Sequence, residues 1–209
     1  MSTSAQALAF ATPDDGEELA RAELYGLLAR LYVAAPDEPL LEQFRVAVTQ
    51  APQEGAFLEA PWQELVAAMR ASDAQAAADE YDALFQGVGK PEVFLYGSYY
   101  LAGFLNEKPL AALRADLARL GLGRDEGAGE TEDHVAYVFE VMRYLIAGDD
   151  VEVCNLEQQR RFFRAHVQPW LGSFCEALAA HPRAQLYRAV AGFTQKFVEV
   201  EAQGFDLLE

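Results

Sequence analysis

A helical period of apolar residues runs through this chain and constrains its fold more than any other feature. The period is clearest after residue 134, where one face would carry Val135, Val138, Phe139, Met142, Leu145 and Ile146. Spacing of three and four residues places such side chains on one side of an α-helix. No segment alternates apolar and polar residues over a useful length. The sequence therefore predicts an all-α protein, a single-domain helical bundle rich in antiparallel neighbours.

The same period, with the positions of Pro and Gly, divides the chain into about nine to ten helices. The clearest are expected at residues 17–33, 39–49, 61–70, 76–85, from 109 onward, 132–147, 155–180 and 182–203. Pro169 lies inside the seventh of these and predicts a kink or a break there. Residues 1–15 are expected to be a disordered tail, which leaves residues 16–209 as the helical domain.

Charge restricts the classes of partner. The chain has 33 acidic and 16 basic residues, a net charge of −17. This balance argues against nucleic acid and anionic membrane surfaces, both of which need a basic footprint. It would attract a cationic peptide or protein segment, although plain solubility explains the charge equally well.

Cellular location is predicted from cysteines and from apolar runs. Cys154 and Cys175 are far apart and form no CxxC pair, which fits a reducing compartment. The first 15 residues contain no basic residue and no sustained apolar run, unlike a signal peptide or an anchor. No stretch approaches about 18 uninterrupted apolar residues, so no membrane insertion is expected. We expect a cytoplasmic protein.

The segment from Glu130 to His134 reads Glu-Thr-Glu-Asp-His and lies between a Gly-rich loop and the periodic helix after it. In the simplest interpretation Thr131 is the N-cap, and Glu132 and Asp133 complement the helix dipole. A cap does not explain His134, which could bind a ligand or act as a switch.

Enzymatic motifs are largely missing. Glu130 and His134 are four residues apart and have no second copy, unlike the Glu-x-x-His pairs of di-metal bundles. The stretch Gly87 to Lys90 lacks the earlier Gly and the following Ser or Thr of a phosphate loop. A metal- or nucleotide-dependent enzyme would therefore depend on the Glu130–His134 cluster alone. We assign no catalytic residue and no metal ligand, and we expect that the protein is not an enzyme.

Six segments in a fixed order resemble one family. They are Tyr81-Asp-Ala-Leu-Phe85, Tyr96-Gly-Ser-Tyr-Tyr-Leu101, Lys108-Pro109, Glu130-Thr-Glu-Asp-His134, His166-Val-Gln-Pro-Trp170 and Leu186-Tyr-Arg-Ala189. Together they resemble the TorD/DmsD family of redox-enzyme maturation chaperones, with NarJ as a more distant relative, over most of the chain. The family hallmark, Glu-Pro-Glu-Asp-His in its shorter form, matches at Glu130, Glu132, Asp133 and His134. Thr131 stands where proline is usual, which makes the turn less rigid.

The resemblance implies an all-helical cytoplasmic chaperone for a molybdopterin oxidoreductase. Such proteins bind the twin-arginine leader and the apo form of the catalytic subunit, assist cofactor insertion and delay export. A leader combines two guanidiniums with an apolar helix-forming run, so its complement is a groove with carboxylates beside an apolar wall. By the resemblance, the groove comprises Glu130, Glu132, Asp133, His134, Tyr32, Leu84, Phe85, Tyr96, Ser98 and Tyr99.

Some expectations remain open at this stage. The aromatic run after residue 96 would be a binding platform if exposed and core if buried, and core is the commoner outcome. His134 could contact the ligand or brace the loop, and the Gly-rich loop at 121–130 would serve as a hinge. No cofactor is expected; the family has been associated with guanine-nucleotide binding and domain-swapped dimers, and neither is assumed. The alternative to a leader-specific chaperone or an enzyme is a helical adaptor without leader specificity.

Overall fold

The computed structural model describes residues 16–46, 57–87, 89–125 and 127–207; the predicted tail at residues 1–15 lies outside them. Across these residues the secondary structure is helical and contains no strand, which confirms the all-α prediction. The elements are α1 (Gly16–Val33), α2 (Glu38–Val46), α3 (Glu59–Ala71), α4 (Ala74–Phe85), α5 (Gly97–Ala102), α6 (Lys108–Arg119), α7 (Val135–Ala147), α8 (Leu156–Phe162), the π-helical turn η1 (Phe163–Val167), α9 (Gln168–Ala180) and α10 (Leu186–Asp206). None of the helices described is long and apolar enough to cross a membrane.

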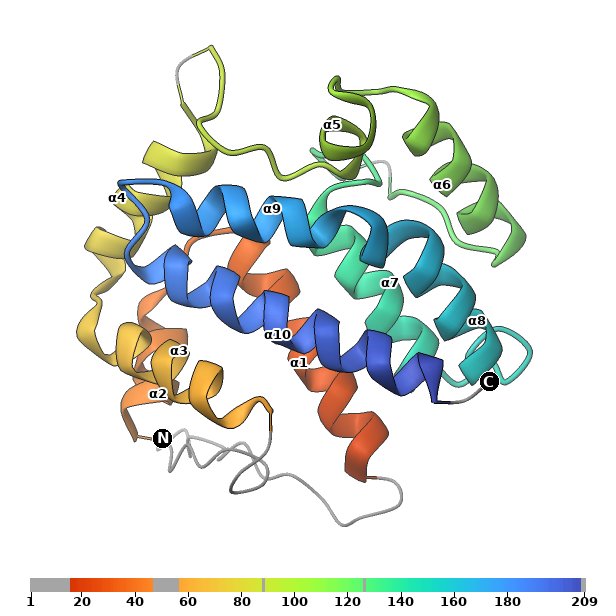
Figure 1. Ribbon diagram of the computed structural model, residues 1–209, viewed down its shortest axis with the longest axis horizontal. Coiled ribbons are helices and arrows are strands. Elements are labelled where there is room, and N and C mark those ends of the chain that lie inside the picture. The colour runs from red at the N-terminus through yellow and green to blue at the C-terminus, as the bar shows by residue number, and fades with distance from the viewer. Residues whose placement is uncertain (1–15, 47–56, 88, 126, 208–209) are drawn as a thin grey trace.

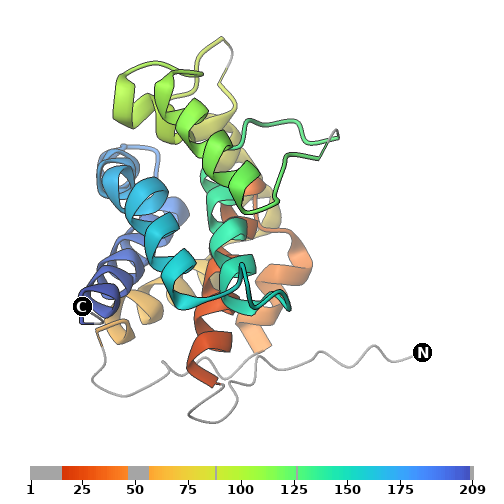
Figure 2. The same ribbon diagram turned by 90° about the vertical axis from the view of Figure 1, so that its right-hand side faces the viewer.

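The helices pack in two layers. α9 and α10 lie side by side in front of α1 and α7, and α1 packs most extensively against α7 (Figures 1 and 2). α2, α3 and α4 cover one end of this body, and α3 also contacts α10. The principal contact of α6 is with α5, and this pair lies at the opposite end (Figure 2).

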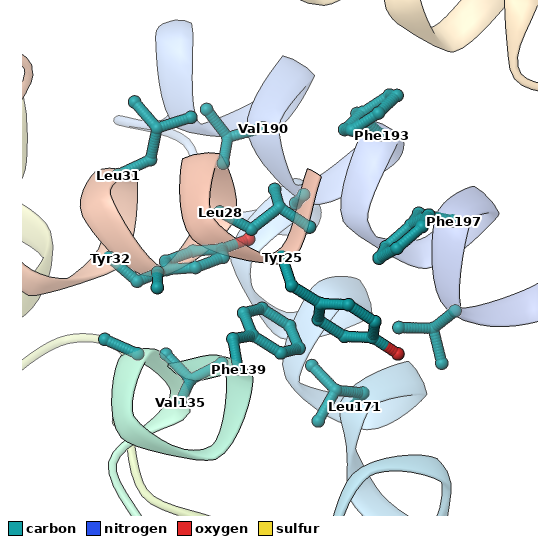
Figure 3. Close-up of a cluster of buried hydrophobic side chains, with 14 of the residues drawn as sticks. Tyr25, Leu28, Leu31, Tyr32, Val135, Phe139, Leu171, Val190, Phe193 and Phe197 are labelled. Carbon is teal, nitrogen blue, oxygen red and sulfur yellow. The ribbon is translucent and has the colours of Figure 1, made fainter. Parts of the chain in front are cut away.

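Aromatic and aliphatic side chains from four helices fill the space between the layers (Figure 3). The residues at its centre are fully or almost fully buried: Tyr25, Leu28, Leu31, Tyr32, Val135, Phe139, Leu171, Val190, Phe193 and Phe197. Burial of each large apolar side chain stabilises a fold by about 1.5–3 kcal/mol, which is why the periodic stripes fold together. The tyrosine hydroxyls in this core have partners, since Tyr25 donates to Glu201 at 3.0 Å and Tyr32 pairs with Thr194 at 2.9 Å.

The break expected at Pro169 takes the form of a widened helical turn. α8 continues through the π-helical η1 into α9, with Pro169 in the first turn of α9. Pro169 has no N–H to donate. The carbonyl of Ala165, four residues earlier, therefore lacks its regular donor, and the wider turn accommodates this change. Nearby, the indole Nε1 of Trp170 donates to the carbonyl of His166 at 2.7 Å.

Candidate functional site

Two segments that are distant in sequence meet at a single antiparallel bridge between Tyr96 and His134. The N–H of Gly97 donates to the carbonyl of Asp133 at 2.9 Å, and the N–H of Val135 donates to the carbonyl of Leu95 at 2.8 Å. This bridge holds the start of α5 against the start of α7. It brings the acidic segment 130–134 beside the aromatic run that follows residue 96.

Asp133 is buried and holds the start of α5. One carboxylate oxygen accepts from the N–H of Ser98 at 2.9 Å, and the other accepts from the hydroxyl of Thr131 at 2.6 Å. A carboxylate at a helix start satisfies an N–H that has no partner within the helix. Both oxygens thus bind protein groups, and the role of Asp133 in this structure is to position the site.

His134, and not Thr131, is the N-cap of α7, so the helix begins at Val135 rather than at residue 132. The interpretation of Thr131 as the cap was therefore wrong, because its hydroxyl donates to Asp133 instead. The Nδ1 of His134 accepts from the N–H of Ala136 at 3.2 Å, and its ring packs edge-on against Tyr96. Burial lowers the pKa of His134 to about 4, despite the opposing effect of nearby carboxylates. His134 is accordingly neutral at pH 7 and braces the loop.

The two glutamates of the segment lie nearer the surface. Glu132 accepts from Nε and Nη2 of Arg114 at 2.9 and 2.8 Å, which ties α6 to the loop and lowers the pKa of Glu132. Glu130 accepts a hydrogen bond from the hydroxyl of Tyr96. Burial of Tyr96, followed by the adjacent Glu130 carboxylate, raises the pKa of that hydroxyl. These two carboxylates are the members of the segment that a ligand could reach.

The predicted apolar wall is mostly core. Tyr32, Leu84, Phe85 and Ser98 are buried, so none of them lines a groove in this structure, which corrects that part of the expectation. The rings packed around Tyr32 belong to Phe139, Phe174 and Tyr187, and Phe85 packs against Tyr81 and Tyr187. These side chains belong to the hydrophobic core. Tyr96 and Tyr99 are partly exposed and remain candidates for contact.

The exposed or partly exposed apolar residues at and beside α5 include three that sequence reasoning did not single out, Phe94, Phe104 and Leu105. We call this set, together with Tyr99 and Leu101, the α5 ridge. Phe94 stacks on Tyr99 with ring centroids 3.9 Å apart, and Phe104 is 71% exposed. Leu101 and Leu105 are also exposed. An available signal was the apolar pair after Gly103, because a short turn between helices is usually polar.

A cavity of about 320 Å³ opens next to Glu132. It lies between the end of α6, the loop that follows and the outer face of α7, and its surface is mostly apolar. The lining comprises Leu117, Leu122, Gly123, Arg124, Asp125, Ala128, Glu132, Tyr137, Glu140, Val141 and Tyr144. Its size is in the range of small-ligand pockets, and it could accept one large side chain of a partner. Among the residues with described positions, no cluster of His, Cys, Asp or Glu could hold a metal ion.

Comparisons with known proteins agree with this architecture. Residues 52–176 match the family model described as nitrate reductase delta subunit. The chaperone protein TorD of a classical Vibrio cholerae O1 strain is 26% identical over 204 residues, which cover 90% of this chain and 93% of TorD. TorD of an El Tor strain is 29% identical over 139 residues, 63% of each chain.

A solved structure shares the fold. The crystal structure of a protein assigned to redox enzyme maturation in Archaeoglobus fulgidus superposes with a TM-score of 0.59 and is 18% identical. The superposition covers 93% of this chain and 99% of that one. The resemblance drawn from the six sequence segments is therefore confirmed. The chain belongs to the family of nitrate reductase delta subunits and TorD chaperones, and it is a redox-enzyme maturation chaperone rather than an enzyme.

Proposed function

We propose that this chaperone binds the twin-arginine leader and the apo form of a molybdopterin oxidoreductase catalytic subunit. In this proposal it acts in the cytoplasm, assists cofactor insertion and delays export until insertion is complete. One observation carries the proposal beyond family membership: the Tyr96–His134 bridge brings the acidic segment 130–134 beside the start of α5, and Leu101, Phe104 and Leu105 at the end of α5 and just after it are exposed.

The chemistry of a leader matches that surface. Its two guanidiniums pair well with carboxylates, for which Glu130 and Glu132 are available. Its apolar run would lie on the α5 ridge, since an exposed apolar patch of this kind marks an interaction site. The net charge of −17 would steer a cationic leader toward the chaperone.

The buried members of the predicted set have a supporting role in this proposal. Asp133 and His134 hold α5 and the loop in register, and Ser98 offers its backbone N–H to Asp133. Tyr32, Leu84 and Phe85 belong to the hydrophobic core. The loop at 121–130 would be the hinge, because it joins α6, which packs chiefly on α5, to α7. No bound cofactor takes part.

A matched pair of phenylalanines provides the test. Phe104 on the ridge is 71% exposed, and Phe57, just before α3, is 79% exposed. The chaperone would be co-expressed with a candidate catalytic subunit, and the two proteins would be purified together. Phe104→Ser should reduce capture of the subunit, because loss of a central apolar anchor costs more than about 1 kcal/mol. Phe57→Ser should leave capture unchanged.

Two outcomes would contradict the proposal. Equal loss of capture in both phenylalanine variants would mean that the α5 ridge is not the contact surface. Capture of the subunit that persists after both leader arginines are replaced by glutamine would favour the adaptor without leader specificity. The fold of each variant would be checked by its unfolding transition.

A further inference from the structure

The ion pair between Arg114 and Glu132 is unequal in its exposure. The Arg114 side chain is 52% exposed, whereas the Glu132 side chain is 14% exposed. The carboxylate of Glu132 is therefore mostly buried, whereas the guanidinium of Arg114 lies on its solvent side. An exposed cation gains little from such a pair and can return to water at small cost. A carboxylate that is only 14% exposed is less favourable without a cation nearby.

The surroundings of Glu132 suit a second guanidinium. Glu132 lines the cavity between α6 and α7, whose other charged lining residues are Arg124, Asp125 and Glu140. Glu140 already pairs with Arg143 at 2.7 Å, so Glu132 and Asp125 are the carboxylates considered for a second guanidinium. Two tyrosines, Tyr137 and Tyr144, form part of its wall. Carboxylates beside aromatic faces are the groups on which guanidinium binds and stacks.

From this arrangement we infer that, in the free chaperone, Arg114 holds the carboxylate of Glu132 with which a leader arginine would pair. Binding would exchange one guanidinium for another: a leader arginine enters the cavity and pairs with Glu132, and Arg114 turns out to solvent. The inference rests on the proposed function. In it, Arg114 is the group of this chain that competes with the leader for Glu132. Arg114 thereby sets the minimum affinity for binding, because a leader must displace it from Glu132.

The geometry of α6 agrees with an exchange that leaves the fold intact. Leu110, Leu113 and Leu117 are buried along α6, and Asp116 on the same helix pairs with His166 at 2.7 Å. These contacts hold α6 in place without help from Arg114. Release of Arg114 would then free its side chain while α6 stays docked.

Arg119 offers a matched control on the same helix. Its side chain is 41% exposed and pairs with Asp116, so its removal subtracts the same charge without touching Glu132. A fluorescent peptide with a twin-arginine motif and an apolar run would be titrated into the full chain, and anisotropy would be measured. Arg114→Ala and Arg114→Gln should each bind it about two- to fivefold more tightly than Arg119→Ala does. The gain should vanish for a peptide with glutamine in place of both arginines.

Each result discriminates between the two proposals. If the wild type binds the peptide and the Arg114 and Arg119 variants have equal affinity, the exchange is overturned and leader binding stands. If neither the wild type nor either Arg114 variant binds, leader binding itself fails. Unfolding transitions of both Arg114 variants show that the fold is retained, and the glutamine variant keeps the bulk of the side chain.

Discussion

Asp133→Ala should destabilise the fold through loss of the contacts that hold α5. The change removes the acceptor for the buried N–H of Ser98 at 2.9 Å and for the hydroxyl of Thr131 at 2.6 Å. A hydrogen bond to a charged group contributes about 1.5–3 kcal/mol, and a buried donor left without a partner bears the full cost. Thr131 is only partly buried and can turn to water, so its loss is smaller.

Together these losses should lower the free energy of unfolding by about 3 kcal/mol. For a chain of this size the corresponding fall in Tm is about 6–12 °C. Asp133→Asn keeps an oxygen for the N–H of Ser98 and should cost about 1 kcal/mol. Denaturant titration followed by circular dichroism measures these differences directly.

Asp125 is the control for this measurement. Its carboxylate also accepts a backbone N–H, from Gly127 at 2.7 Å, but on an exposed loop. Asp125→Ala should therefore change the free energy of unfolding by less than about 0.5 kcal/mol. If Asp133→Ala costs no more than Asp125→Ala, then Asp133 does not hold α5 and the positioning role assigned to it is wrong.

Three further predictions concern buried contacts of the fold. The pKa of His134 is lowered from 6.5 to about 4, so the stability that its neutral form contributes is complete above pH 6.5 and is lost as pH falls toward 4. The free energy of unfolding should fall by about 3 kcal/mol over this range. His134→Asn retains an N-cap and should make the free energy of unfolding less dependent on pH. An unchanged pH dependence in that variant would mean that other groups cause the loss. Gly97→Ala places a methyl 3.0 Å from the Trp170 indole and should cost about 1–3 kcal/mol in denaturant titration; a neutral effect would mean that α5 can shift freely. Glu201 binds Arg21 at 2.7 and 2.8 Å, so Glu201→Ala leaves the largely buried Arg21 without its anion. This change should lower the free energy of unfolding by about 3–5 kcal/mol. A loss below about 1 kcal/mol would show that solvent replaces the pair.

The helical fold was predictable because it depends on local periodicity. The stripe that begins with Val135 and Phe139 is buried as its spacing requires, and Pro169 marks a real irregularity. Tyr32 shows a limit to inferring site residues from family resemblance. The family resemblance placed it on the groove wall, and the structure places it in the core.

The details of the site depend on contacts between distant segments, which no local pattern contains. The start of α7 was misplaced because Thr131 bonds to Asp133, and Asp133 in turn bonds to Ser98, 35 residues away. α5 has six residues, too few to display a helical period. The aromatic run on α5 was considered as a binding platform, but the exposed Phe104 and Leu105 after it were missed.

Leader recognition is tested most directly by isothermal titration of the full chain with a twin-arginine leader peptide and with its twin-lysine counterpart. Lysine keeps the charge and loses the forked donors that pair with carboxylates. Recognition through Glu130 and Glu132 predicts saturable binding of the arginine peptide and affinity lower by about tenfold for the lysine peptide. Equal affinity for the two peptides, or no binding of either, would contradict it.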